Sequence, residues 1–197
     1  MKNLTAEELL AKYTSKISHA VEVRRLAMMI FDETCTKVRE LSNKERSYLE
    51  AAALLHDIGY HIASKGHNKY SLKMIMDEGL AEFDYEELKL VACIARYHRG
   101  SLPDKNEHEI YSELEKNERK IVKRLGGILR LADGLDRGHL NLIKKVKLEY
   151  DEKNNIVKFI LMPNMPEYLP DISSAIRKRD LYEIGFKCQS ILIFDED

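Results

Sequence analysis

The sequence predicts a mainly α-helical protein that ends in a small α+β appendage. Up to residue 145, apolar side chains recur at helical spacing between helix-capping motifs, whereas short strand-like runs follow Leu142. The longest apolar run, residues 26–31, is too short to cross a membrane. The chain has 197 residues, of which 44% are hydrophobic, and this is enough for one core. We expect a helical domain over residues 1–145 and a tail over residues 146–197.

Helix starts in the first part coincide with capping boxes, in which a Thr, Ser or Asp precedes a Glu by three residues. The boxes are Thr5–Glu8, Ser42–Glu45 and Asp84–Glu87. Three helices are expected to begin at these boxes: one at Thr5, one that runs from Ser42 to near residue 59, and one that runs from Asp84 to residue 100. Three further helices are expected over about residues 17–41, 69–77 and 121–138. Residues 101–109 are expected to form a loop.

The tail is expected to have the order strand, strand, helix, strand. The first two strands, over residues 145–150 and 156–161, would form a hairpin, and residues 172–187 and 191–194 would form the helix and the last strand. A tail this short cannot fold alone. We therefore expect it to pack on the helical domain, or to pair with a second chain through an edge strand in a homodimer. We assign it a role in shape or assembly rather than in chemistry.

Charge and cysteine usage limit the function classes. The net charge is −1, which does not favour nucleic acid or a membrane surface as a partner. Cys35, Cys93 and Cys188 are odd in number and widely spaced, so we expect neither a disulfide framework nor a cysteine-type zinc site. The N-terminal residues 1–5 lack the apolar core of a signal peptide. Together these features indicate the cytoplasm.

Histidine and aspartate side chains are the candidate metal ligands. His56 and Asp57 follow the apolar residues 51–55, His19 lies on the preceding helix, and Asp133 lies on the last long helix. An ionised aspartate on a buried helix is costly unless a cation neutralises it, and imidazole and carboxylate groups suit zinc, manganese or iron. Each residue taken alone could instead be a helix cap or a core residue satisfied by the backbone.

The order His19, His56-Asp57, Asp133 resembles the HD superfamily of metal-dependent phosphohydrolases. The surrounding blocks cover residues 17–32, 51–60, 66–71, 95–100 and 129–139. Together they are similar to the C-terminal HD-like domain of the exopolyphosphatase/guanosine pentaphosphate phosphatase family. That family's phosphatase site lies in N-terminal actin-like domains with glycine-rich phosphate loops, which this chain lacks. The resemblance therefore does not carry over exopolyphosphatase activity through that site.

The resemblance implies an HD-type helical bundle that hydrolyses a nucleotide-like or other small phosphoester through a metal-activated water. His19, His56, Asp57 and Asp133 would hold one divalent ion, and Mn, Fe, Zn, Mg and Ni are not distinguished. HD enzymes with a second ion add two histidines, for which His67 and His98 are the candidates, with Asp57 bridging the ions. Alternatively, His67 caps its helix and His98 bonds the carbonyl groups of the last helical turn.

Basic residues beside the candidate ligands would bind the phosphate. Lys69, Arg99 and Arg137 are the best placed in sequence, and with Asp57 they are the candidate catalytic residues. The other basic residues between residues 119 and 147 are explained as well by a solvated helix face. Two functions follow: a phosphohydrolase acting on a small phosphorylated substrate, or a non-catalytic regulatory module that binds a phosphorylated ligand or a protein partner.

Overall fold

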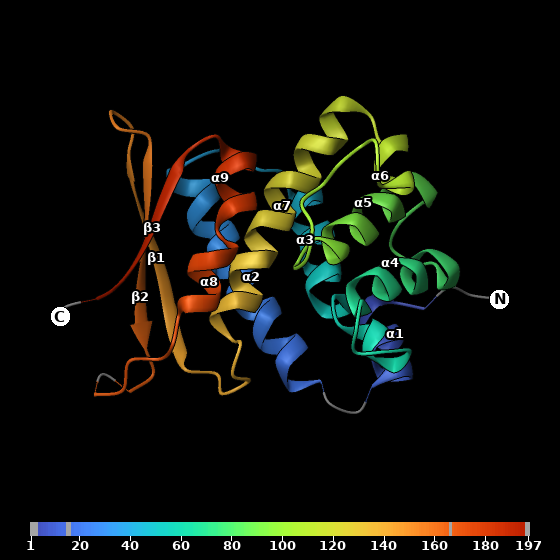
Figure 1. Ribbon diagram of the computed structural model, residues 1–197, viewed down its shortest axis with the longest axis horizontal. Helices are drawn as coiled ribbons and strands as arrows, with labels where there is room; N and C mark the ends of the chain where they lie inside the picture. Colours follow the sequence, from blue (N-terminus) through green and yellow to red (C-terminus); the bar gives the residue numbers. More distant parts are fainter. Residues whose placement is uncertain (1–3, 15–16, 166, 196–197) are drawn as a thin grey trace.

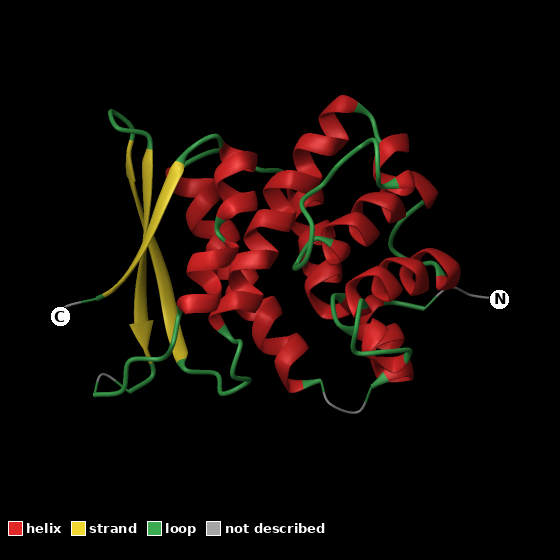
Figure 2. Ribbon diagram, in the orientation of Figure 1, coloured by secondary structure: helices red, strands yellow, loops and turns green. Residues whose placement is uncertain are grey.

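The computed structural model describes residues 4–14, 17–165 and 167–195 (Figure 1). The expectation for the N-terminus rests partly on residues 1–3, which lie outside this range. Helices make up most of the chain, and a three-stranded sheet covers one side of them (Figure 2). The predicted fold class, mainly α with a small α+β appendage, is confirmed. In the described part of the chain, no helix has the length and apolar character needed to span a membrane.

Two of the first three helices begin at a capping box. The three helices are α1 (Ala6–Tyr13), α2 (Ser18–Lys37) and α3 (Asn43–Leu55), and the first and third open with the predicted capping boxes. A short 3-10 helix, η1 (Ile58–His61), follows α3. Since α3 ends at Leu55, His56 and Asp57 lie in the turn between the two helices rather than inside a continuous helix.

The next helices complete the bundle. They are α4 (His67–Glu78), α5 (Tyr85–Arg96), α6 (Glu109–Glu113) and α7 (Lys116–Leu135). The short α6 begins at the last residue of the segment expected to be a loop, residues 101–109. Helix α7 begins earlier than predicted, because Glu115 and Glu118 form a further capping box. The long α7 runs through the middle of the molecule, between α5 on one side and the C-terminal helices on the other (Figure 1).

The tail forms the predicted sheet. Strand β1 (Ile143–Asp151) pairs antiparallel with β2 (Ile156–Pro163), which pairs parallel with β3 (Gln189–Phe194). Strand β1 thus begins before the expected domain boundary at residue 145. The helix expected over residues 172–187 is two helices, α8 (Ser173–Lys178) and α9 (Asp180–Phe186). The two helices are separated at Arg179, and the carboxylate of the next residue, Asp180, accepts hydrogen bonds from Arg130 and from the N–H of Leu181.

Close backbone contact joins the tail to the helices. A Cβ atom on Gly127 would lie 2.5 Å from the Cα of Tyr182, and one on Gly134 would lie 2.6 Å from the Cα of Ala175. Only glycine permits α7 to approach α8 and α9 this closely. The ring of Tyr182 then packs edge-on against Phe159 of the sheet, with centroids 5.0 Å apart. The tail packs on the helical domain, as expected, and both contribute to one apolar core.

Candidate metal centre

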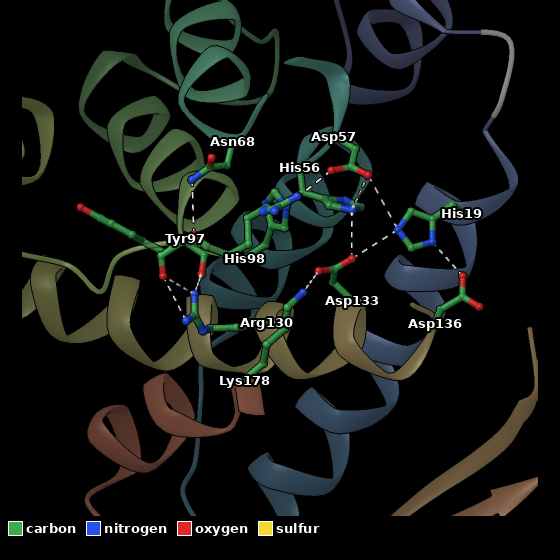
Figure 3. A network of polar contacts seen from close by, with 12 residues as sticks. His19, His56, Asp57, Asn68, Tyr97, His98, Arg130, Asp133, Asp136 and Lys178 are labelled. Carbon is green, nitrogen blue, oxygen red and sulfur yellow. Dashed lines mark hydrogen bonds and ion pairs between the residues drawn. The ribbon is translucent and has the colours of Figure 1, made fainter. Parts of the chain in front are cut away.

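The six predicted metal ligands come together in the structure. Five of them, all but His67, are labelled in Figure 3. His19 lies in the first turn of α2, His56 and Asp57 lie in the α3–η1 turn, and His67 lies at the start of α4. His98 lies in the turn after α5, and Asp133 lies in the last turn of α7. All except Asp57 are at least nine-tenths buried. Five separate segments therefore converge on one polar cluster inside the helical body.

Asp57 lies between two pairs of histidines. Its Oδ2 atom is 3.8 Å from Nε2 of His19 and 3.5 Å from Nε2 of His56. Its Oδ1 atom is 3.1 Å from Nε2 of His67 and 3.5 Å from Nε2 of His98. Each carboxylate oxygen thus faces two imidazole nitrogens, which is the arrangement that a bridging carboxylate needs.

Asp133 lies beside the pair formed by His19 and His56. Its Oδ1 atom lies 3.4 Å from Nε2 of His19 and 3.9 Å from Nε2 of His56. Among the described residues, two sets of donor atoms lie within 4.8 Å of one another: His19 with His56 and Asp133, and His56 with Asp57 and His98. These spacings suit ions that bind to nitrogen and oxygen at about 2 Å.

The outer nitrogen of each histidine is already occupied. Nδ1 of three of them lies 2.7–2.9 Å from a backbone carbonyl oxygen, and the pairs are His56 with Ala53, His67 with Ser64 and His98 with Ala95. Nδ1 of His19 lies 2.8 Å from Oδ2 of Asp136. Carbonyl and carboxylate oxygens only accept, so each Nδ1 carries a hydrogen. In the neutral tautomer, each Nε2 therefore points a lone pair into the cluster.

These inward lone pairs require a positive charge. The Nε2 atoms of His19 and His56 are buried and have no hydrogen-bond partner among the residues that the structure describes. Those of His67 and His98 face each other at 3.2 Å, where two lone pairs would repel. A buried polar atom without a partner is costly, and a cation or a proton at these positions removes the cost. Four imidazoles and two carboxylates with fixed outer contacts are a donor set that fits a divalent transition metal.

The environment keeps Asp57 ionised and His98 neutral. Burial acts to raise the pKa of Asp57, but the charge of His56 and the interaction with His67 outweigh burial and lower the pKa well below its usual range. Burial lowers the pKa of His98 to about 3, so this imidazole is uncharged at neutral pH. Both states are those that metal ligands need.

Asp133 and His19 are coupled in the same way. Burial acts to raise the pKa of Asp133, yet the interactions with His19 and Lys178 lower it well below its usual range. Burial acts to lower the pKa of His19, but its interactions with Asp133 and Asp136 and the charge of Asp57 raise the pKa to about 9. In the metal-free cluster a proton on His19 thus supplies part of the missing positive charge.

Backbone packing positions the ligands. A Cβ atom on Gly59 would lie 2.0 Å from the carbonyl oxygen of His67, so only glycine lets η1 pack against the start of α4. The hydroxyl of Ser71 donates to the carbonyl of His56 at 2.6 Å and accepts from the N–H of Gly59 at 2.9 Å. These contacts join the α3–η1 turn to α4, and hence His56 and Asp57 to His67.

A buried arginine holds the segment that carries His98. Arg130 donates to the carbonyl oxygens of Tyr97, at 3.4 Å, and Gly100, at 3.1 Å (Figure 3). Its Nε atom donates to Asp180 of the tail at 2.9 Å. Arg130 therefore joins α7, the turn after α5 and the start of α9, so the tail helps to fix the position of His98.

A cavity of about 200 Å³ opens onto the cluster and is lined by cations. Arg99 and Arg137, both predicted, line it together with Lys178 of the tail. The ammonium group of Lys178 donates a hydrogen bond to Asp133. The tail therefore supplies a charged group to the site. This corrects the expectation that the tail serves only shape or assembly. Lys69 is exposed on α4 and is not among the residues that line this cavity.

Four residues at the site were not among the predicted site residues. Asp136 follows Asp133 by three residues and caps the C-terminal end of α7, a spacing of about one helical turn that could have identified it. The rings of Tyr60 and His139 stack on His67 and His19, respectively, each with centroids 3.8 Å apart. Neither these stacking partners nor Lys178 has a local sequence signal, because each reaches its partner only through the tertiary fold.

The comparison with protein families agrees with the resemblance seen in the sequence. Residues 1–171 match the family model described as Ppx/GppA phosphatase, domain III. This range includes the six clustered residues and both strands of the hairpin, and it ends before Lys178. Since the match spans most of the 197 residues, the chain belongs to the Ppx/GppA phosphatase domain III family.

Proposed function

We propose that the protein is an HD-type, metal-dependent phosphohydrolase that acts on a small, nucleotide-like phosphoester. The observation that carries this proposal is the set of four buried imidazoles, whose Nδ1 atoms are engaged by fixed acceptors and whose Nε2 atoms face two carboxylates. Membership of a phosphatase family supports action on phosphoesters. The free thiols of the chain favour a cytoplasmic location.

Two divalent ions fit the cluster better than one. His19, His56 and Asp133 would hold the first, His67 and His98 would hold the second, and Asp57 would offer one oxygen to each. A bound divalent ion supplies Lewis acidity, which lowers the pKa of a water molecule and neutralises charge on a phosphate oxygen. His98 also bonds a carbonyl of the last turn of α5, as its alternative required, whereas His67 bonds the carbonyl of Ser64 instead of capping its helix. Both do so through Nδ1 and leave Nε2 for the cluster.

The cations around the small cavity would bind the phosphate group. Arg99 and Arg137 line its mouth, and Lys178 reaches it from α8. Guanidinium groups bind phosphate oxygens through paired hydrogen bonds and so orient the phosphorus atom. Because Asp57 is ionised and partly exposed to this cavity, it faces the side from which the substrate would enter.

Metal analysis followed by a phosphoester panel tests the proposal. Protein purified without chelator should hold one to two divalent ions per chain, by the ligand count above. Asp57→Ala should lose most of them, and His67→Ala and His98→Ala should each lose about one if the second ion is present. Metal-loaded protein should hydrolyse p-nitrophenyl phosphate or nucleoside phosphates, and chelation should abolish turnover.

Matched variants separate the phosphate-binding residues from the surface. Arg99→Ala and Arg137→Ala should lower kcat/KM by about tenfold or more without loss of metal. Lys69→Ala, which removes an exposed cation from the neighbouring helix, should leave both metal content and turnover unchanged. Metal binding without hydrolysis of any phosphoester would instead favour the regulatory module. Full turnover by metal-free protein would contradict the proposal.

A further inference from the structure

A second and larger cavity adjoins the metal centre. Its volume is about 960 Å³, and it lies where the end of α1, the start of α2 and η1 meet. It shares four lining residues with the small cationic cavity: His19, Asp57, Tyr60 and His139. The two cavities are therefore adjacent, with the candidate ligands between them. The proposed function uses only the small one.

The larger cavity has a different chemical character. Its walls are mostly apolar, with Leu10, Ile17, Leu54 and Ile58 contributing side chains. Among the described residues that line it, none is a lysine or an arginine, whereas the small cavity has three cations. A group entering the larger cavity would bury apolar surface against these walls and would meet none of the three cations that line the small cavity. The pair of cavities therefore suits a ligand that is anionic at one end and uncharged at the other.

Aromatic rings line the same space. Tyr13 and His61 meet edge to face with centroids 4.9 Å apart, and the hydroxyl of Tyr13 is held by a hydrogen bond to Glu78. Tyr60 and His139 lie at the boundary with the metal centre. Rings held in this way offer stacking and edge contacts to a flat ligand. His61 lines this cavity and not the small one.

We propose that the larger cavity binds the organic group of the substrate, and that this group is uncharged and carries an aromatic ring. The inference rests on the proposed function, since it places the phosphate of the same molecule at the metal centre. The volume is that of a typical small-molecule site and exceeds what a phosphate group alone requires. A linear inorganic polyphosphate, which carries charge along its whole length, would meet apolar walls here and is disfavoured as the substrate.

Ile17 provides a substitution that tests the cavity without disturbing the core. It lines the cavity and its side chain is 46% exposed, so Ile17→Glu places a charge in the cavity at little risk to folding. Val21 is 39% exposed one turn further along α2 and does not line the cavity. Val21→Glu is therefore the matched control for a new charge on the same helix.

The probes are 1-naphthol, 1-naphthyl phosphate, inorganic phosphate and inorganic tripolyphosphate. Binding of 1-naphthol is followed by naphthyl fluorescence, which the absence of tryptophan from the chain leaves clear. We expect wild-type protein and Val21→Glu to bind 1-naphthol equally, and Ile17→Glu to bind it about tenfold more weakly, with no change for inorganic phosphate. With metal-loaded protein, kcat/KM for 1-naphthyl phosphate should exceed that for tripolyphosphate and should fall in Ile17→Glu alone.

The outcomes separate this inference from the proposed function. If 1-naphthol binds in an Ile17-dependent way but no phosphoester is hydrolysed, the cavity assignment stands and the proposed hydrolysis fails. If 1-naphthyl phosphate is hydrolysed equally by Ile17→Glu and wild-type protein, hydrolysis stands and the cavity assignment is overturned. Preferred hydrolysis of tripolyphosphate would also overturn it.

Discussion

Two adjacent glycines of α7 should respond oppositely to alanine. A Cβ atom on Gly127 would lie 2.5 Å from both the N and the Cα atoms of Tyr182, so α9 would have to move. A Cβ atom on Gly126 would instead lie 3.2 Å from Cδ2 of Leu181 and 3.6 Å from Cβ of Tyr97. Flexible side chains can give way by a few tenths of an ångström, whereas helix backbone cannot. Gly127→Ala therefore tests the contact between the tail and the bundle.

The expected magnitudes follow from two opposing effects. Alanine is better than glycine inside a helix by about 1 kcal/mol, and this gain applies to both positions. Overpacking costs about 1–3 kcal/mol, and a clash with backbone places Gly127→Ala at the upper end of that range. The free energy of unfolding should therefore fall by about 2 kcal/mol in Gly127→Ala and should be unchanged or up to about 1 kcal/mol higher in Gly126→Ala.

Urea unfolding followed by circular dichroism measures the difference. For a chain of this length, a loss of about 2 kcal/mol corresponds to a fall in Tm of roughly 4–8 °C. The two variants should keep the same m-value, because both unfold the same core. If Gly127→Ala is as stable as Gly126→Ala, then α9 does not pack on α7 as closely as the structure has it, and the reasoning is refuted.

Three further perturbations test the site and its surroundings. Lys178→Met should weaken binding of inorganic phosphate by about tenfold, and it should lower the free energy of unfolding of the metal-free protein by about 1–3 kcal/mol because Asp133 loses its cationic partner. Calorimetry measures the first effect and urea unfolding the second, and unchanged values would place the lysine outside the site. Asp136→Asn should lower metal affinity by about 10–100-fold, because a neutral amide orients His19 less firmly than a carboxylate does. Competition with a chromogenic chelator measures the affinity, and a wild-type value would contradict the role of Asp136. Burial raises the pKa of Cys93 to about 12, so the thiol stays protonated at pH 8. Cys93 should therefore react with iodoacetamide only after the protein unfolds, which mass spectrometry can show. Rapid labelling of the folded protein would be inconsistent with the burial of this thiol.

Features that depend on neighbouring residues could be predicted from the sequence. The capping boxes at Thr5, Ser42 and Asp84 lie within one helical turn, and each helix begins where they indicate. The break between α8 and α9 could not be predicted in this way, because Asp180 takes its partner Arg130 from a position 50 residues earlier in the chain. An isolated reading of residues 172–187 shows only a continuous helical pattern.

The basic residues of the site likewise show that closeness in the sequence does not predict closeness in the fold. Lys69 was chosen because it lies two residues from His67, but residues two apart point to different sides of a helix. The structure accordingly leaves Lys69 exposed and outside the small cavity. Lys178 reaches Asp133 across 45 residues through the packing of α8 on α7, so proximity in sequence could not identify it.

The charge of the cluster connects metal binding with phosphate binding. Asp57 and Asp133 are both ionised, and the ammonium group of Lys178 is paired with Asp133 alone. An anionic substrate entering the small cavity would meet the ionised carboxylate of Asp57, which opposes the attraction of Arg99 and Arg137. Positive charge between Asp57 and the four imidazoles would reverse the local sign, and the two arginines would then act with it. On this reasoning the basic residues do not form a phosphate site by themselves, and the affinity for phosphate depends on prior occupation of the histidine cluster by a cation.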